Sequence, residues 1–128
     1  MSKAIHTDAA PEAIGTYSQA VSASGLVFLS GQIPLDPQTM ELIDGDFEAQ
    51  VRRVFDNLQA VCVAAGGDLN QVVKFTIYLT DLGNFAIVNQ VMTELLEAPF
   101  PARATVEVSG LPKGVGVEVD AVMVSPQG

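Results

Sequence analysis

Five polar side chains near the C-terminus are spaced so that they could bind a small acid. Alternation of polar and apolar residues assigns them to one face of each of two expected strands: Arg103, Thr105 and Glu107 in the first, and Glu118 and Asp120 in the second. If these strands pair, a guanidinium and several carboxylates stand on a common surface. Arginine is suited to binding a carboxylate through two hydrogen bonds. The pattern equally fits a solvated face with ordinary cross-strand ion pairs, which stabilise little.

Polar residues elsewhere in the chain are further candidates. Asn89 follows Phe85 by four residues and so lies beside the apolar stripe of an expected helix, where its amide needs either a structural partner or a ligand. Ser30 and Gly31 end an expected strand, at a corner that exposes a hydroxyl and backbone groups. Tyr17 fits two interpretations, a core ring with a solvated hydroxyl or a ring that covers a pocket.

The sequence argues against several other chemistries. His6 is the only histidine, so a catalytic triad would have to use a residue close to the terminus. Clustered metal ligands and glycine-rich phosphate loops are absent from the sequence, which predicts neither a metal nor a cofactor. Cys62, the only cysteine, falls on the core face of an expected helix and is interpreted as a plain buried thiol.

Composition limits the class of protein. The 128 residues predict one domain, 1–128, and the net charge of −9 disfavours nucleic acid and anionic membranes as partners. The chain has no apolar run that could span a bilayer and no signal peptide, so we expect a cytoplasmic protein. A hydrophobic content of 48% is high for a small monomer and indicates an oligomer.

Periodicity gives the elements that must position these residues. Period-2 patterns and turn residues predict strands at residues 3–6, 17–23, 26–31, 72–80, 103–109 and 117–125. Residues 33–44 are expected to form a loop. Apolar spacings of three and four predict a helix from the Asp46 region to the glycines at 66–67, and a second over 84–97 that is capped by Asp81. This order predicts an α+β fold, a two-layer sandwich of a mixed sheet with both helices on one face.

Several segments together resemble the RidA/YjgF family of reactive-intermediate deaminases, also described as endoribonuclease L-PSP-like. They are residues 10–20 (APEAIGTYSQA), 30–34 (SGQIP), 100–103 (FPAR), and 111–113 (LPK) followed by 117–119 (VEV). These segments have the family's order and spacing over essentially the whole chain. The resemblance implies a chorismate-mutase-like fold and a homotrimer with a central barrel and ligand clefts between subunits.

The resemblance also implies an activity. Family members that carry the arginine hydrolyse 2-imino acids and their enamine tautomers, such as 2-iminobutanoate, 2-iminopropanoate and 2-aminoacrylate, to 2-keto acids and ammonia. Pyridoxal-phosphate dehydratases release these intermediates, and the hydrolysis needs no cofactor. By position, Arg103 matches the residue that binds the substrate carboxylate, and Glu118 the acidic residue that orients or activates water. The resemblance also matches five residues to positions that line the cleft: Tyr17, Ser30, Gly31, Asn89 and Thr105, which follows Arg103 by two residues.

The chain departs from its relatives at three places. Thr105 replaces a frequent cysteine, Met92 and Leu95–Leu96 replace frequent aromatic residues, and the segment between Asn89 and Arg103 is shorter. These changes predict an altered cleft wall and substrate range. Two alternatives stay open: a non-catalytic module that binds keto acids as regulatory ligands through the same arginine, and an RNA-acting translation inhibitor, which the charge of −9 disfavours.

Overall fold

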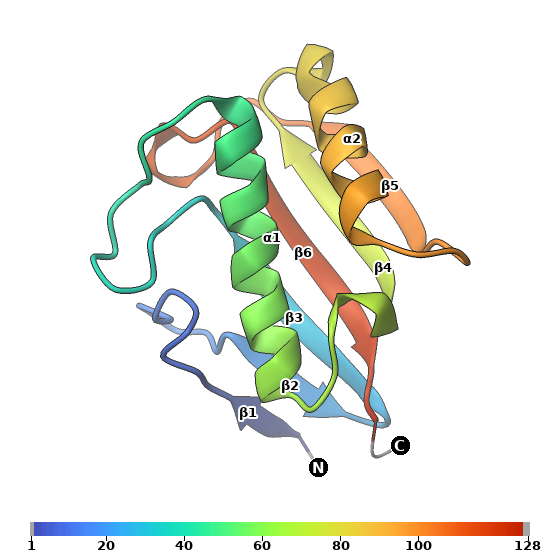
Figure 1. Cartoon of the computed structure of the whole chain (residues 1–128). Coiled ribbons are helices and arrows are strands. Elements are labelled where there is room, and N and C mark those ends of the chain that lie inside the picture. The colour runs from blue at the N-terminus through green and yellow to red at the C-terminus, as the bar shows by residue number, and fades with distance from the viewer. Residues whose placement is uncertain (1, 127–128) are drawn as a thin grey trace.

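A computed structural model describes residues 2–126 (Figure 1). Over this range the chain forms six strands, two helices and three short 3₁₀ turns. The strands are β1 (Lys3–Ile5), β2 (Ala20–Ala23), β3 (Leu26–Gln32), β4 (Val72–Leu79), β5 (Ala102–Glu107) and β6 (Val117–Val124). The helices are α1 (Phe47–Ala64) and α2 (Phe85–Leu95), and the turns are η1 (Leu69–Gln71), η2 (Leu82–Asn84) and η3 (Pro112–Gly114).

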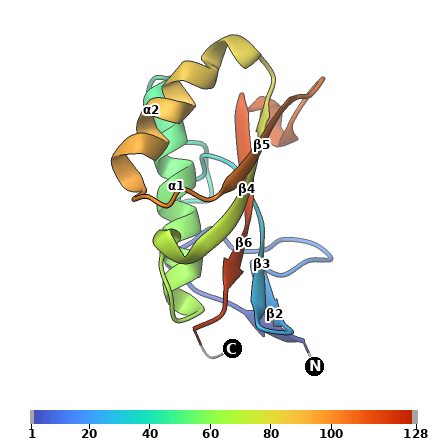
Figure 2. The ribbon, with the colours of Figure 1, turned by 90° about the vertical axis from the view of Figure 1, so that its right-hand side faces the viewer.

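The strands form one mixed sheet in the order β1-β2-β3-β6-β4-β5. Every neighbouring pair is antiparallel except β4 and β5, which run parallel because α2 crosses over between them. Both helices cover the same face of the sheet, as Figure 2 shows from the side. The prediction of an α+β sandwich with two helices on one face is therefore confirmed, and no helix in residues 2–126 covers the opposite face, called the open face below.

Helix α1 begins and ends where the sequence predicts. The Asp46 side chain accepts a hydrogen bond from the backbone N–H of Ala49 at 2.9 Å and so caps the helix. At the other end Gly66 has φ +92°, a conformation that residues with a side chain rarely adopt. Its N–H donates to the carbonyl of Val63. The helix has 18 residues, and Ala65 is its C-terminal cap.

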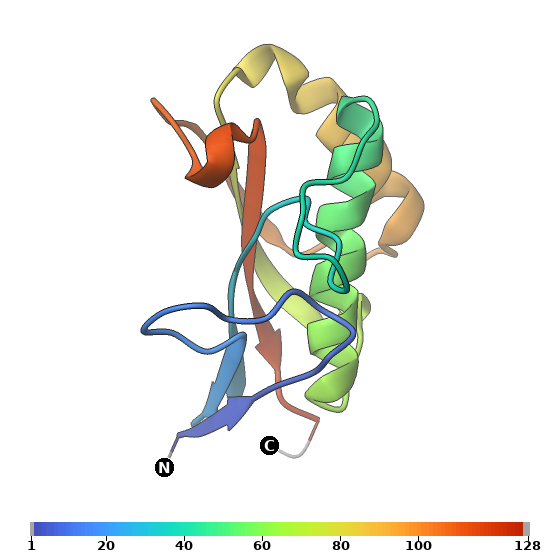
Figure 3. The same cartoon turned by 90° about the vertical axis from the view of Figure 1, so that its left-hand side faces the viewer.

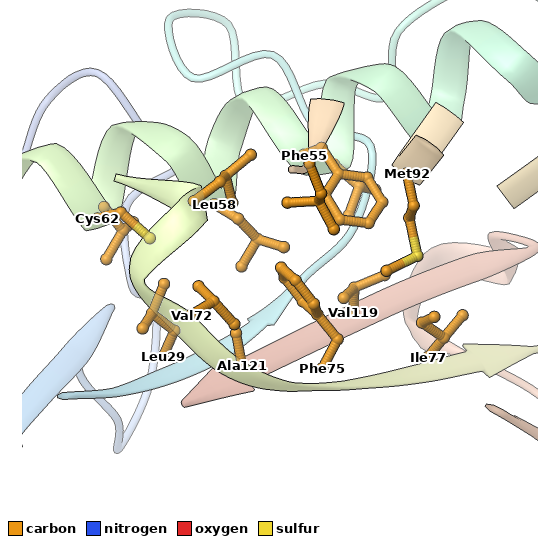
Figure 4. Close-up of a cluster of buried hydrophobic side chains, with 14 of the residues drawn as sticks. Leu29, Phe55, Leu58, Cys62, Val72, Phe75, Ile77, Met92, Val119 and Ala121 are labelled. Atoms are coloured by element: carbon orange, nitrogen blue, oxygen red, sulfur yellow. The ribbon is translucent and has the colours of Figure 1, made fainter. Parts of the chain in front are cut away.

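The core lies between α1, α2 and the covered face of the sheet (Figure 4). Phe55 of α1 meets Phe75 of β4 edge to face, with ring centroids 5.6 Å apart, and both rings are fully buried. Cys62 is a buried thiol, as predicted, and burial raises its pKa to about 12. In residues 2–126 neither α1 nor α2 is both long and apolar enough to cross a membrane.

Several element boundaries, and one loop, differ from the prediction. Asp81 caps η2, where its carboxylate accepts from the N–H of Gly83, and α2 itself begins later, at Phe85. Strand β2 begins at Ala20, later than predicted, and the side-chain amide of the buried Gln19 before it donates to the carbonyls of Thr7 and Pro11. The 33–44 segment is a loop apart from one isolated bridge between Leu35 and Leu42.

The last two strands do not pair, so the condition for a shared polar surface is not met. Strand β4 lies between β5 and β6, so the two never touch. Arg103 stands opposite Phe75, a core residue, and therefore on the helix-covered side of the sheet. Glu118 stands opposite Tyr78 and faces the open side. The Arg103 guanidinium and the Glu118 carboxylate therefore do not share a surface. The crossover through α2 places β5 at the sheet edge, and β6 fills the position between β3 and β4.

Candidate functional site

The Arg103 side chain is held by two residues of α2. Its Nη1 donates a hydrogen bond to Oδ1 of Asn89 at 2.8 Å, and its guanidinium carbon lies 4.8 Å from the centre of the Phe85 ring. Phe85 and Asn89 are four residues apart and so point to the same side of the helix. The partner that the Asn89 amide requires is therefore the arginine. Together the two contacts restrict the guanidinium to one orientation at the protein surface.

A hollow of about 320 Å³ lies beside this guanidinium. One part of its wall is apolar and comes from α2 and the segment that leads into β5: Met92, Leu96, Phe100 and Pro101. The other part is polar and comes from Asn89 and Thr93 beside Arg103. Phe100 is 61% exposed, whereas Met92 is buried and also packs into the core (Figure 4). A cation beside an apolar wall is suited to a small acid that carries a short aliphatic side chain.

Glu118 lies in a second hollow of about 610 Å³ on the open side. The hollow is bordered by the 11–17 loop, the end of β3 and the η3 loop, and Figure 3 shows these two loops projecting on the side away from the helices. Burial, and then the negative charge of Asp120, raise the pKa of Glu118. A carboxylate with a raised pKa in a hollow is suited to accepting a proton from water.

The other residues of the second hollow have distinct positions. A Cβ on Gly31 would overlap the Glu118 carboxylate, so only glycine leaves room for it. Ser30 Oγ donates to the carbonyl of Ser18 at 2.6 Å, which ties β3 to the residues before β2. The Tyr17 ring is 54% exposed at the border of the hollow, so it is not a core residue.

The structure thus divides the predicted site into two parts. Tyr17, Ser30 and Gly31 lie with Glu118, and Asn89 lies with Arg103. Thr105 belongs to neither hollow: it is half-buried on β5 beside Ile77. Among the described residues no cluster of three or more His, Cys, Asp or Glu could hold a metal ion.

Sequence reasoning gave no site role to Phe85 or Lys113, although the four-residue spacing of Phe85 from Asn89 is a signal that could have found Phe85. Tyr78 was also missed, because its neighbour Asp120 is 42 residues away in the chain.

Comparison with known proteins identifies the chain's relatives. A family model described as Endoribonuclease L-PSP matches residues 7–125. The chain belongs to the RidA/YjgF/RutC family. This RidA-family chain is 58% identical to the protein DfrA of Myxococcus xanthus, over 96% of the chain and 95% of DfrA. It is 41% identical to the 2-iminobutanoate/2-iminopropanoate deaminase of Dermatophagoides farinae, with 94% of each covered.

The family's solved structures share this fold. The crystal structure of RidA from an Antarctic Psychrobacter species superposes with a TM-score of 0.91 at 52% identity, covering 95% of this chain and 98% of that one. The resemblance seen in the sequence, and the fold that it implied within one chain, are therefore confirmed.

Proposed function

We propose that this RidA-family chain is an imine and enamine deaminase that hydrolyses 2-iminobutanoate, 2-iminopropanoate and similar imino acids. The observation that carries the proposal is the Arg103 guanidinium, held by Asn89 and Phe85 beside a hollow with a partly apolar wall. This arrangement suits a 2-imino acid, whose carboxylate needs a cation and whose short side chain needs an apolar wall. The name of the Dermatophagoides relative supports the same reaction class.

The proposed reaction needs only positioned groups and water. Arg103 binds the substrate carboxylate and fixes the imine carbon in place. Water attacks that carbon and forms a C–O bond while the π electrons of the C=N bond move to the nitrogen, and Glu118 accepts a proton from the water. Glu118 passes this proton to the nitrogen, which gives a carbinolamine. The hydroxyl proton then also moves to the nitrogen as the C–N bond breaks and the C=O bond forms, and the products are the 2-keto acid and ammonia. The imine is already electrophilic, so the proposal includes no cofactor or metal.

We further propose that a second copy of the chain completes the site. Within one chain, Arg103 and Glu118 lie on opposite sides of the sheet and open into different hollows. In a homotrimer of single-domain copies, the Arg103 hollow of one copy can meet the Glu118 hollow of the next, with the open faces forming a central barrel. Large apolar side chains on the open face support this assembly: Phe28, Val106 and Val124 are all at least 40% exposed.

The proposed role is protective. Imino acids of this size are released by pyridoxal-phosphate dehydratases, so we place the protein in the cytoplasm beside such enzymes, with an indirect link to them and no direct contact. RNA cleavage is not part of the proposal, because the chain has 6 Lys and Arg against 15 Asp and Glu. Arg52 is moreover paired with Glu48 and Glu94.

A coupled assay tests the proposed activity. Threonine dehydratase generates 2-iminobutanoate, and semicarbazide traps the free imine as a semicarbazone. We expect this protein to lower the rate of semicarbazone formation while 2-ketobutanoate accumulates. If the folded, assembled protein binds 2-ketobutanoate saturably but leaves the semicarbazone rate unchanged, the deaminase proposal is wrong and the alternative of a keto-acid-binding module is favoured.

The hydrogen bond between Asn89 and Arg103 gives a smaller, specific prediction. Asn89→Ala leaves the arginine in place but removes its restraint, and a hydrogen bond to a charged group is worth about 1.5–3 kcal/mol. We expect kcat/KM to fall about tenfold, mainly through a higher KM. Gln90→Ala is the matched control, since Gln90 is an exposed amide on the same helix. Equal kinetics for the two variants would contradict the role given to Asn89.

A further inference from the structure

Three polar residues meet on the open face, where β4 and β6 pair. Glu118 is the register partner of Tyr78, and Asp120 lies two residues farther along β6 on the same face. The Tyr78 hydroxyl donates a hydrogen bond to Oδ2 of Asp120 at 2.9 Å. All three side chains are only partly exposed. Two carboxylates and a phenol thus lie on neighbouring positions of the open face.

The bond is directed to one carboxylate and not to the other. Tyr78 is paired with Glu118 in the sheet, yet its hydroxyl donates to Asp120. The bond and the charge of Asp120 raise the pKa of Tyr78, so the phenol stays protonated and remains a donor at neutral pH. The hydrogen bond therefore fixes the position of the Asp120 carboxylate. Glu118 receives no hydrogen bond from Tyr78 and experiences the field of that carboxylate.

The remaining charged groups near Glu118 come from three elements. The loop before β2 contributes Glu12 and Tyr17 to the hollow, and η3 contributes Lys113. Lys74 of β4 lies on the same face as Tyr78. It is farther from Glu118 along the strand, because its register partner on β6 is Val122. Strand β3 contributes only Ser30 and Gly31, which carry no charge. Burial and then the charge of Asp120 raise the pKa of Glu118, and Asp120 is the carboxylate to which Tyr78 donates.

We propose that Tyr78 and Asp120 are positioning residues that set the pH at which Glu118 can accept a proton from water. Asp120 supplies a fixed negative charge that keeps the Glu118 proton bound to higher pH. The Tyr78 hydroxyl counters part of that charge and prevents the second carboxylate from turning into the hollow. The inference rests on the proposed function, since it assigns a task to residues around the proposed base.

The two residues are expected to act in opposite directions. In Asp120→Asn the charge is gone, so Glu118 ionises more easily and the acid limb of the kcat/KM profile moves to lower pH. In Tyr78→Phe the Asp120 charge is no longer countered by the hydroxyl, so the acid limb moves to higher pH. A neighbouring like charge in a partly buried place moves the pH at which a carboxyl group ionises by on the order of one unit, and we expect the acid limb to move by a similar amount.

The experiment measures pH profiles of both variants beside two controls. Asp56→Asn removes one carboxylate from the exposed side of α1, on the other side of the molecule, and should leave the limb where the wild type has it. Asp120→Glu keeps the charge and should bring the limb back toward the wild type. If the acid limb of Asp120→Asn lies at the same pH as the acid limb of Asp56→Asn, or at a higher pH, the proposal is overturned.

A second readout separates this inference from the deaminase proposal. The Glu118 carboxyl can be titrated directly by carbon NMR in protein labelled at glutamate, with Glu118→Gln identifying the signal. A lower titration midpoint in Asp120→Asn and a higher one in Tyr78→Phe support the inference even if the wild type hydrolyses no imine. Unchanged midpoints overturn it even if the wild type is fully active. Circular dichroism and sedimentation establish that each variant is folded and assembled as the wild type is.

Discussion

Arg103→Ala should lower kcat/KM for 2-iminobutanoate at least about a hundredfold, which corresponds to about 2.7 kcal/mol of lost transition-state stabilisation. The substrate carboxylate would lose two charge-assisted hydrogen bonds, and nothing in the Arg103 hollow replaces them, since its other lining residues carry no charge. The fold should be unaffected, because Arg103 is exposed and its two contacts lie on the surface of α2. The coupled assay and a thermal melt measure the two effects.

The matched control is Arg52→Ala. It removes the same charge from a surface network with Glu48 and Glu94, where exposed ion pairs stabilise little, and Arg52 lines neither hollow. Its kcat/KM should equal that of the wild type. Retained activity in Arg103→Ala, or a comparable loss in Arg52→Ala, would refute the role of Arg103 as the carboxylate-binding residue.

Glu118→Gln should lower kcat about a hundredfold to ten-thousandfold, the range that a positioned base contributes. Glutamine fills the same space beside Gly31 but cannot accept the proton from water. The loss should therefore appear in kcat with little change in KM. Glu41→Gln removes an exposed carboxylate from the 33–44 loop and is the matched control.

Glu118→Gln should not destabilise the fold. Burial and Asp120 raise the folded-state pKa of Glu118 above its unfolded value. A carboxyl shifted in this direction favours folding while it is protonated, and this contribution is lost as the pH rises through the folded-state value. Glutamine is neutral throughout, so at neutral pH the Tm of Glu118→Gln should equal or exceed that of the wild type, and the difference should disappear in acid. A lower Tm at neutral pH would contradict this account.

Local patterns were enough to predict the elements and the core. The apolar spacing from Phe47 to Ala65 and the cap at Asp46 define α1 without reference to the rest of the chain. The alternation of Phe75, Ile77 and Leu79 likewise identifies the buried face of β4. Such signals depend on neighbours within one or two turns, and for that reason they are present in the sequence itself.

Strand order was not predictable in this way. The last two strands follow one another in the chain with a short connection, which favours pairing as a hairpin. Instead β4, which precedes β5 in the chain, lies between them, because α2 packs on the sheet and returns the chain parallel to β4. The face on which Arg103 and Glu118 stand depends on this long-range choice. Individual site residues could therefore be named from the family motifs, whereas their separation into two hollows could not.

The separation of Arg103 from Glu118 has a genetic consequence. In the proposed assembly a lesion in one hollow spares the other hollow of the same copy, so two defective alleles can complement each other. When Arg103→Ala and Glu118→Gln copies mix at random in a closed ring, about one site in four joins the intact arginine of one copy to the intact glutamate of the next. Each allele alone gives no intact site, so a cell that carries both would retain a function that neither provides by itself.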